Sequence, residues 1–343
     1  MPPGGELALI EAIAGRLSAR RQDVIVGVGD DAAVLRAAPV CITSVDAVVE
    51  GVHFQLGEGR SSHADVGFKA LGSALSDIAA MGARQGEAYI VLGLSPATTH
   101  TQALAVIDGA LELAQATGVS LLGGDVVTAQ ALFVCVTVVG WAQLQDPIVY
   151  RSGARPGDLV GVTGELGLAG AGLAHMQGSV ELSAANAAKA LERSLRPLPR
   201  LLEGRALAQA GASALVDISD GLAADAGHIG RASGVSLEID LGSLPTPPAV
   251  REAARQLKAP PWQLAASAGE DYELCACVPA SRRSAAERAL RDAGGTSITW
   301  IGEVAGPAQR GPGAAFTIDG RQVRLAGFEH RWQEAPGPRR RRR

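Results

Sequence analysis

The sequence predicts a two-domain fold of the α/β type, in which layers of helices pack on sheets. The chain has 343 residues, which exceeds the size at which a single hydrophobic core stops growing. Apolar residues make up 47% of it, so a large core can form. Strand-like and helix-like segments alternate with short turns along most of the chain, as they do in layered folds.

The first part of the chain, residues 1–148, is expected to form an N-terminal domain. Apolar residues at helical spacing predict an amphipathic helix from Glu6 to Ala19. Strand-like apolar runs and helices rich in small residues follow. They are the strands Val24–Val28, Val40–Val45, Glu87–Leu94, Ser120–Leu122 and Leu132–Val139, and the helices Ser62–Met81 and Thr99–Thr117.

A stretch rich in turn residues, Arg151–Asp158, indicates a domain boundary, and residues 149–334 are expected to form a C-terminal domain. Asp319-Gly320 is a favoured hairpin dipeptide and predicts a hairpin over Ala314–Leu325. The other expected elements are strands Leu159–Thr163, Ala214–Ile218, Ser236–Ile239, Tyr272–Val278 and Ser297–Val304, helices Leu222–Ala232 and Ser281–Ala293, and further helices from Gly164–Met176 to about Ala210.

The charge distribution disfavours a nucleic-acid partner. The net charge is −4, and Arg339–Arg343 contribute +5, so the rest of the chain carries −4 − 5 = −9. Aromatic residues make up only 3%, too few for extensive base stacking. Arg339–Arg343 follow two prolines, and residues 335–343 are predicted to be a disordered, Arg-rich end.

Cysteine use and the N-terminal segment indicate a reducing, cytoplasmic location. None of the four cysteines, Cys41, Cys135, Cys275 and Cys277, has the CxxC spacing, and we expect buried free thiols. Residues 1–17 do not resemble a signal peptide, and no apolar run reaches membrane-spanning length. We therefore expect no membrane partner.

Five acidic segments predict a magnesium-dependent site that handles polyphosphate. Each carries one or two Asp beside Gly, Ser or Thr, next to an apolar run. Ionised groups near a core are costly unless a positive group compensates them, and the chain has only three lysines. Divalent cations would supply that compensation. The segments are Gly29–Asp31, Ser44–Asp46, Ser76–Asp77, Gly123–Asp125 and Asp217–Asp220.

Each acidic segment also has a structural interpretation. Gly27–Ala32 superficially resembles a dinucleotide-binding GxGxxG loop, but its two carboxylates would repel a pyrophosphate, and helix capping and metal binding both remain open. Asp46 is expected at the carboxyl end of its strand, where active sites of open sheets lie. Gly123–Asp125 is either a plain turn or a loop that approaches a ligand closely.

Five residues, in the helix Ser62–Met81 and at or after the end of the strand Ala214–Ile218, have alternative roles: Asp77, Lys69, Ser219, Asp220 and Asp217. Asp77 lies near the C-terminus of a helix, where a carboxylate opposes the macrodipole and needs compensation. Lys69 on the same helix is expected to be a surface residue. Ser219 or Asp220 is expected to N-cap the following helix, which leaves Asp217 on or near a buried face.

Taken in order, these motifs closely resemble the thiamine-monophosphate kinase family, from about Glu6 to Trp332. The resemblance implies an aminoimidazole-ribonucleotide synthetase-like fold, in which the N-terminal domain forms a homodimer interface and the C-terminal domain covers an ATP cleft. It also implies Mg²⁺-dependent, direct in-line phosphoryl transfer from ATP to thiamine phosphate. The matching segments are Gly27–Val34, Ser44–Phe54, Ser76–Gly82, Gly123–Asp125, Arg151–Asp158, Asp217–Leu222 and Gly269–Leu274.

The resemblance also assigns residue roles. The implied metal ligands are Asp31, Ser44, Val45, Asp46, Asp77, Asp125, Asp217 and Asp220. The implied ATP contacts are Gly124, Asp125, Arg151 and Ser219, and the implied thiamine-phosphate contacts are His53, Glu270 and Phe328. Asp46, Asp125 and Arg151 are the implied catalytic residues. Val45 replaces a Thr that is common in the family, so a metal contact there would have to use the backbone carbonyl.

Other functions are less compatible with the sequence. A selenophosphate synthetase would need a nucleophilic Cys or selenocysteine, and none precedes Cys41. An aminoimidazole-ribonucleotide synthetase is not expected to carry the segments Ser76–Gly82 and Gly269–Leu274. A catalytically inactive nucleotide-binding protein remains an alternative, although every implied Asp ligand is present.

Overall fold

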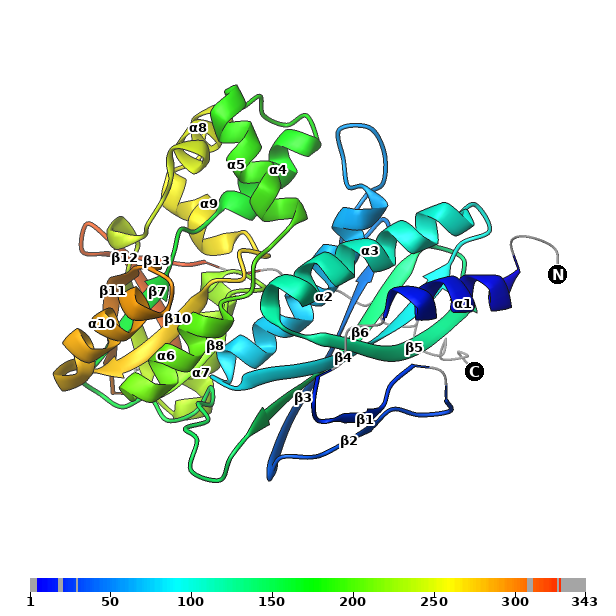
Figure 1. Cartoon of the computed structure of the whole chain (residues 1–343). Coiled ribbons are helices and arrows are strands. Elements are labelled where there is room, and N and C mark those ends of the chain that lie inside the picture. The colour runs from blue at the N-terminus through cyan, green and yellow to red at the C-terminus, as the bar shows by residue number, and fades with distance from the viewer. Residues whose placement is uncertain (1–4, 18–20, 29, 307–310, 326, 328–343) are drawn as a thin grey trace, which may run out of the picture.

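The structure is a computed structural model, and it describes residues 5–17, 21–28, 30–306, 311–325 and 327. Two sheets with helices on their faces form the described part (Figure 1). The α/β class predicted from the sequence is therefore confirmed. The predicted disordered tail, residues 335–343, lies outside the described residues.

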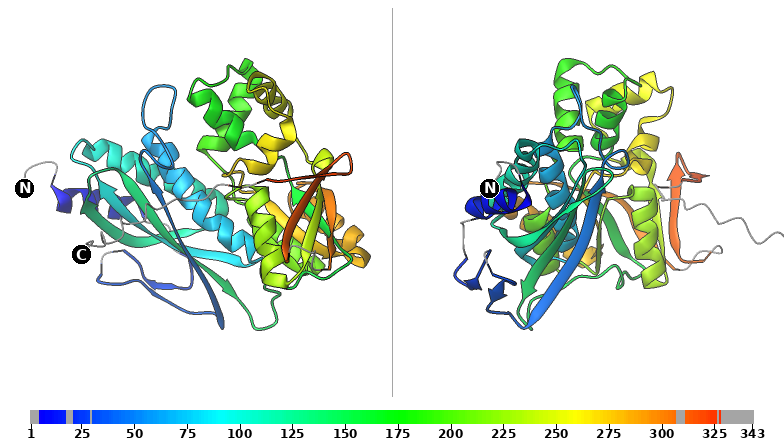
Figure 2. Two further views of the ribbon diagram at one scale, coloured as in Figure 1. Left: turned by 180° about the vertical axis from the view of Figure 1, so that it is seen from behind. Right: turned by 90° about the vertical axis from the view of Figure 1, so that its right-hand side faces the viewer.

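The first sheet has four strands in the order β3-β6-β4-β5. Helices α1, α2 and α3 lie on one side of it (Figures 1 and 2). A short hairpin of β1 and β2 precedes the sheet. The elements are α1 (Glu6–Arg16), β1 (Val24–Val26), β2 (Val34–Leu35), β3 (Val40–Val49), α2 (His63–Ala80), β4 (Arg84–Leu94), α3 (His100–Thr117), β5 (Ser120–Thr128) and β6 (Phe133–Ala142).

All four strands of this sheet are longer than predicted, and for β3 and β5 the difference changes where two acidic segments lie. Asp46 was expected at the carboxyl end of its strand, but β3 continues to Val49 because β6 pairs with it along its whole length. Gly123–Asp125 was expected in a loop, but β5 continues through it to Thr128, paired in parallel with β4. Asp46 and Asp125 are therefore mid-strand residues.

The second sheet has seven strands in the order β13-β12-β9-β11-β7-β10-β8. Helices α6 and α10 contribute to the core on one face, and α7 and α9 to the core on the other. The elements are β7 (Asp158–Thr163), α4 (Leu168–Met176), α5 (Ala184–Leu195), α6 (Leu201–Ala210), β8 (Ala214–Asp217), α7 (Leu222–Ser233), β9 (Ser236–Asp240), α8 (Pro248–Gln256), α9 (Pro261–Ser267), β10 (Leu274–Pro279), α10 (Arg283–Ala293), β11 (Ile298–Ala305), β12 (Gly313–Ile318) and β13 (Arg321–Val323).

One C-terminal detail, the terminal hairpin, was predicted correctly, and three others were not. The hairpin β12–β13 turns at Asp319 and Gly320, whose φ angles of 49° and 73° suit a hairpin turn. Helices α8 and α9 were missed. The predicted strand from Tyr272 begins instead at Leu274, because Tyr272 has a φ of 49°.

The hydrophobic core continues from the first sheet to the second. Helix α2 is buried along most of its length and packs against α3 and α6. A Cβ atom on Gly204 of α6 would lie 1.9 Å from the Ala79 carbonyl oxygen, so only glycine allows α6 to approach α2 this closely. One core cluster includes residues of α2, α6, β10 and α10. This contact holds the C-terminal end of α2 beside β8.

The predicted burial of the cysteines is half right. All four are free. Cys275 and Cys277 are fully buried on one face of β10, where burial raises the pKa of the Cys275 thiol to about 12. Cys41 is exposed and Cys135 is half-buried, because both lie on the face of the first sheet that the helices do not cover. No described helix is long and apolar enough to cross a membrane.

Candidate functional site

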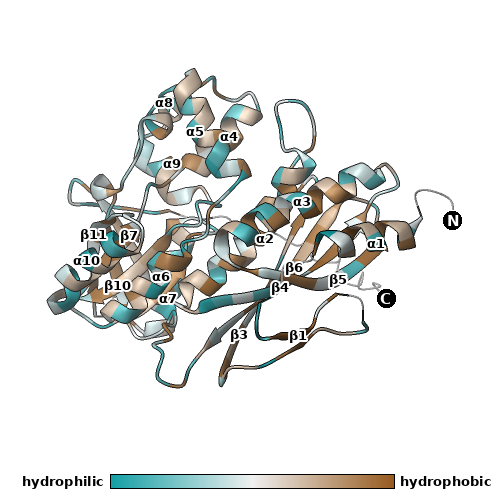
Figure 3. Cartoon of the chain, viewed as in Figure 1, coloured by the Kyte–Doolittle hydropathy of each residue, from teal (hydrophilic) through white to brown (hydrophobic). Residues whose placement is uncertain are grey.

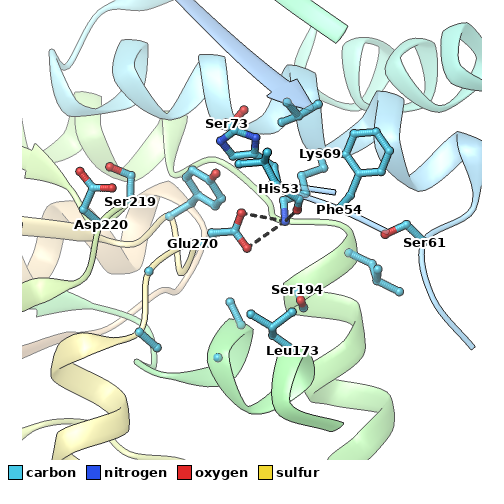
Figure 4. A pocket seen from close by; sticks show the side chains of 18 of the residues that line it. His53, Phe54, Ser61, Lys69, Ser73, Leu173, Ser194, Ser219, Asp220 and Glu270 are labelled. Atoms are coloured by element: carbon cyan, nitrogen blue, oxygen red, sulfur yellow. Dashed lines mark hydrogen bonds and ion pairs between the residues drawn. The ribbon is translucent and has the colours of Figure 1, made fainter. Parts of the chain in front are cut away.

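A cavity of about 590 Å³ lies between the first sheet, the end of β8 and the helical layer of α4 and α5 (Figure 4). Carboxylates from four segments line it: Asp46 of β3, Asp77 of α2, Asp217 at the end of β8 with Asp220 after it, and Glu270 before β10. The β3–α2 segment contributes His53 and Phe54, and α4 contributes Leu173 and Met176. The cavity therefore combines an acidic part and an apolar part.

Asp46, Asp77 and Asp217 form the acidic part. Burial and repulsion by Asp46 raise the pKa of Asp77, although the Ser44 hydroxyl donates a 2.5 Å hydrogen bond to it. Asp217 is 3% exposed, and burial together with repulsion by Asp77 raises its pKa to about 7. Asp77 is close enough to repel both of the other carboxylates, so a cation among them would be stabilised.

Two neighbours partly compensate this negative charge. The Ser76 hydroxyl donates a 2.8 Å hydrogen bond to Asp217. Arg151, within the segment between β6 and β7 that joins the two sheets, favours the ionised forms of both Asp77 and Asp217. Arg151 itself is exposed. Arg151 was predicted for the site; it does not line the cavity, and only its charge acts on the two carboxylates.

The turn between β8 and α7 is held by a residue that the sequence reading missed. Ser219 or Asp220 was expected to cap α7, but neither side chain does, and Gly221 is the N-cap residue. Asp225 instead accepts hydrogen bonds from the backbone NH groups of Ser219 (3.1 Å) and Asp220 (3.0 Å). Burial and repulsion by Asp217 raise the pKa of Asp225 to about 7. Both side chains of the Ser219-Asp220 pair are thus left to face the cavity.

Asp125 does not join these carboxylates within one chain. Strand pairing places Asp46 in one row with Val136 and Ile90, on the helix-covered face. Asp125 pairs with Val91, which lies on the opposite face. The two Asp residues are also on the two edge strands, separated by three strand spacings or about 14 Å. Among the described residues, no three Asp, Glu, His or Cys side chains form a ready metal site.

Two other predicted residues, Gly124 and Asp31, do not line the cavity. Gly124 is needed for structural reasons, because a Cβ atom there would lie 1.7 Å from the Ile90 carbonyl oxygen. Asp31 is exposed between β1 and β2, and its backbone NH donates to Asp30. Phe328 lies outside the described residues. Val45 does line the cavity, and 61% of it is exposed.

Lys69 lies inside the cavity, so its expected surface position was wrong. The residue is 5% exposed, and its ammonium group lies 2.9 Å from the Glu270 carboxylate and 3.2 Å from the carbonyl oxygen of His53. Figure 4 shows this ion pair in the middle of the cavity, with Ser219 and Asp220 on one side and Phe54 and Ser61 on the other. Helix α2 thus brings a buried cation to a site with many carboxylates.

The segment that carries Glu270 is strained and firmly held. Glu270 and Tyr272 have φ angles of 67° and 49°, which non-glycine residues rarely adopt. Hydrogen bonds fix both: Glu270 NH donates to the Ser219 carbonyl (2.7 Å) and Tyr272 NH to the Ile218 carbonyl (2.9 Å). The strain aims the Glu270 side chain across the cavity.

The other two acids of this segment are structural. Asp271 is buried and accepts hydrogen bonds from the backbone NH groups of Gly167 (2.6 Å) and Ala169 (3.2 Å), at the start of α4. Glu273 is fully buried and accepts hydrogen bonds from Arg200 (2.7 Å) and Thr163 (2.7 Å). An edge position cannot explain these acids, because β10 lies between β7 and β8.

Leu173 and Met176, apolar cavity residues that lie outside the family motifs, were not predicted as site residues. Leu173 and Met176 come from α4, which approaches the cavity only through long-range packing. No local sequence pattern distinguishes them from ordinary core residues. His53 was predicted, and it accepts a 3.1 Å hydrogen bond from Val49 NH through Nδ1.

Comparisons with known proteins agree with this architecture. Residues 29–142 match the N-terminal domain of AIR synthase related proteins, and residues 155–310 match the C-terminal domain of that family. The chain is 37% identical to the thiamine-monophosphate kinase of Escherichia coli strain K12, over 95% of this chain and 98% of that protein.

Solved structures of thiamine-monophosphate kinases are also similar to this chain. The thiamine-monophosphate kinase of Stenotrophomonas maltophilia K279a has a TM-score of 0.80 and 34% identity, over 93% of this chain and 98% of that one. A structure of AaThiL complexed with AMPPCP and TMP has a TM-score of 0.74 and 29% identity, over 95% and 97%. The chain therefore belongs to the thiamine-monophosphate kinase family, the group of AIR synthase related enzymes that its motifs resemble.

Proposed function

We propose that this enzyme transfers the γ-phosphoryl group of ATP to thiamine phosphate, which yields thiamine diphosphate and ADP. The observation that carries the proposal is the division of the cavity into an acidic part and an apolar part. The acidic part suits metal-bound polyphosphate, and the apolar part suits the rings of thiamine. The relative crystallised with AMPPCP and TMP supports this pair of substrates.

The acidic part fits Mg²⁺ that is completed by phosphate oxygens. Mg²⁺ is usually bound by one or two carboxylates together with water and substrate phosphates, rather than by an all-protein cage. Burial and repulsion by Asp77 raise the pKa of Asp217 to about 7, and burial and repulsion by Asp46 raise that of Asp77; a bound cation would relieve the repulsion. Bound there, Mg²⁺ would neutralise phosphate charge as the two anionic substrates meet.

The protein itself positions the reactants. A phosphate oxygen of thiamine phosphate is already a competent nucleophile, so the transfer needs no general base, and we propose direct in-line displacement. Arg151 would stabilise negative charge on the transferring group, and Ser219 would contact ATP. The apolar walls from α4 would exclude water, which would otherwise compete as an acceptor.

A homodimer would bring Asp125 into the site. The face of the first sheet without helices exposes Val45 (61%) and Val127 (38%), and its strands are hydrophobic along much of their length (Figure 3). Burial of this face against a second copy would remove apolar surface from water. Asp125 lies on that face, so Asp125 of one copy could reach the acidic part of the other. This arrangement gives Asp125 a role that one chain alone cannot.

Product formation tests the proposal. The purified protein, given ATP, Mg²⁺ and thiamine phosphate, should form thiamine diphosphate and ADP in equal amounts, measured by chromatography. EDTA should stop the reaction and excess Mg²⁺ should restore it. A protein that binds both substrates without forming product under these conditions would be the catalytically inactive alternative.

A further inference from the structure

We infer that Lys69 recognises the phosphate of the acceptor, and that it does so by exchanging its ion pair with Glu270 for that phosphate. The inference rests on the proposed function, because it assumes an acceptor that carries both a phosphate and a cation. In this account Lys69 and Glu270 hold each other only while the cavity is empty. The roles of Lys69 and Glu270 are independent of the proposed magnesium site.

The position of Lys69 singles it out. Lys69 and Arg60 are the only Lys or Arg residues lining the cavity in the described part of the chain, and Arg60 is exposed whereas Lys69 is 5% exposed. Burial of an ammonium group is costly unless it is paired, and its partners here are Glu270 and the His53 carbonyl oxygen. Lys69 lies among the buried residues of α2, where an apolar side chain would pack without the cost of burying a charge.

The partner of Lys69 is available for exchange. The Glu270 side chain is 27% exposed, compared with 7% for that of Lys69, so one side of the carboxylate already faces the cavity. Both Glu270 oxygens lie 2.9 Å from the ammonium group. The strained backbone at Glu270, with a φ of 67°, is typical of functional sites. A phosphate dianion carries more charge than a carboxylate and would compete for the ammonium group.

Thiamine phosphate carries one charge of each sign, so it can pair with both Lys69 and Glu270. The molecule carries a cationic thiazolium ring and an anionic phosphate. When its phosphate takes Lys69, Glu270 is released and can pair with the thiazolium, so no buried charge is left alone. The pair also lies between Ser219 and the Asp220 carboxylate on one side and the apolar residue Phe54 on the other. Lys69 would therefore hold the phosphate at the acidic part while the rings lie in the apolar part.

The test compares two ligands that differ only in the phosphate. Affinities for thiamine phosphate and for thiamine are measured by titration calorimetry in wild type, Lys69→Met and Lys69→Arg. In Lys69→Met we expect the ratio of the two affinities to fall about 10- to 100-fold, because a charge-assisted hydrogen bond to phosphate is lost. Lys69→Arg should recover part of the ratio.

Two controls separate recognition from structure. The double variant Lys69→Met/Glu270→Gln leaves no unpaired charge, so its fold is protected, and its ratio should remain as low as that of Lys69→Met. In Glu270→Gln the ratio should stay at the wild-type value or rise, because Lys69 then has no competing carboxylate. An unchanged ratio in Lys69→Met, or a restored ratio in the double variant, would show that Lys69 is only a structural link and would overturn the inference.

The same experiment keeps the two proposals apart. If the wild type forms no thiamine diphosphate but the ratio of affinities falls in Lys69→Met as expected, the proposed function fails and phosphate recognition by Lys69 stands. If the wild type turns over and the ratio does not respond to Lys69→Met, the inference fails and the proposed function stands.

Discussion

Asp217→Asn is expected to lower turnover by about 10³-fold while it stabilises the ligand-free protein above neutral pH. The carboxylate is fully buried beside Asp77, and its folded-state pKa is raised from 3.8 to about 7. Asn keeps an oxygen that can accept the Ser76 hydrogen bond, but it adds no negative charge. The variant therefore loses a metal ligand and also loses the repulsion.

The raised pKa of Asp217 makes the folded protein less stable as pH rises. Between pH 4 and 7 the folded protein keeps a proton on Asp217 that the unfolded chain releases, so this group makes stability fall as pH rises through that window. Asp217→Asn removes this contribution. Its melting temperature should exceed that of the wild type at pH 8, and the difference should shrink towards pH 4. Asp271, whose pKa burial also raises to about 7, should retain its own pH dependence in the variant, whereas Asp225 loses the repulsion by Asp217 that helps to raise its pKa.

A surface carboxylate provides the matched control. Asp108 on α3 forms an exposed ion pair with Arg16, and such pairs contribute about 0–1 kcal/mol. Asp108→Asn should leave turnover unchanged and should not stabilise the protein at pH 8. Full turnover in Asp217→Asn, or a lower melting temperature than wild type at pH 8, would contradict the role given to Asp217.

Mixing two inactive variants is expected to restore activity. Asp46 and Asp125 lie on opposite faces and opposite edges of one sheet. If each site takes Asp46 from one copy and Asp125 from the other, Asp46→Asn and Asp125→Asn are each inactive as homodimers. A mixed dimer contains one site with both wild-type residues. Random re-pairing makes half of the dimers mixed, so about one quarter of wild-type activity should return.

Subunit exchange can be followed directly in this experiment. The two variants are co-expressed with different affinity tags, and the doubly tagged dimer is isolated and assayed for thiamine diphosphate. It should have about half of the wild-type activity per dimer. If the doubly tagged dimer is inactive, each site is built from a single chain and the shared site is excluded.

The sequence predicted elements well where local signals were strong. Helices α2 and α3 begin directly after Ser62 and Thr99, whose side chains form capping boxes with Asp65 and Gln102. Asp319-Gly320 likewise specified the β12–β13 turn. Where neighbouring strands extended an element, the prediction fell short, as it did for β3 and β5. Strand pairing is a long-range interaction that a local pattern does not contain.

In the site too, residues with a local sequence signal were predicted, and residues placed by long-range interactions were not. Asp46, Asp77, Asp217 and Asp220 could be selected because each combined a carboxylate with a small polar neighbour beside an apolar run. Lys69 was placed wrongly, because its burial depends on Glu270, which is 201 positions later in the chain. Leu173 of α4 gave no local signal, since its position depends on how the helical layer packs over the cavity.

The most direct test of phosphoryl transfer is a single turnover with ATP labelled in its γ-phosphate. Enzyme in excess over ATP is mixed with Mg²⁺ and thiamine phosphate, quenched in acid at successive times, and separated into protein, phosphate and thiamine diphosphate. Direct transfer predicts that all label lost from ATP appears in thiamine diphosphate, with none on the protein. Label that accumulates on the protein, or that is released as inorganic phosphate while thiamine phosphate stays unchanged, would contradict the account.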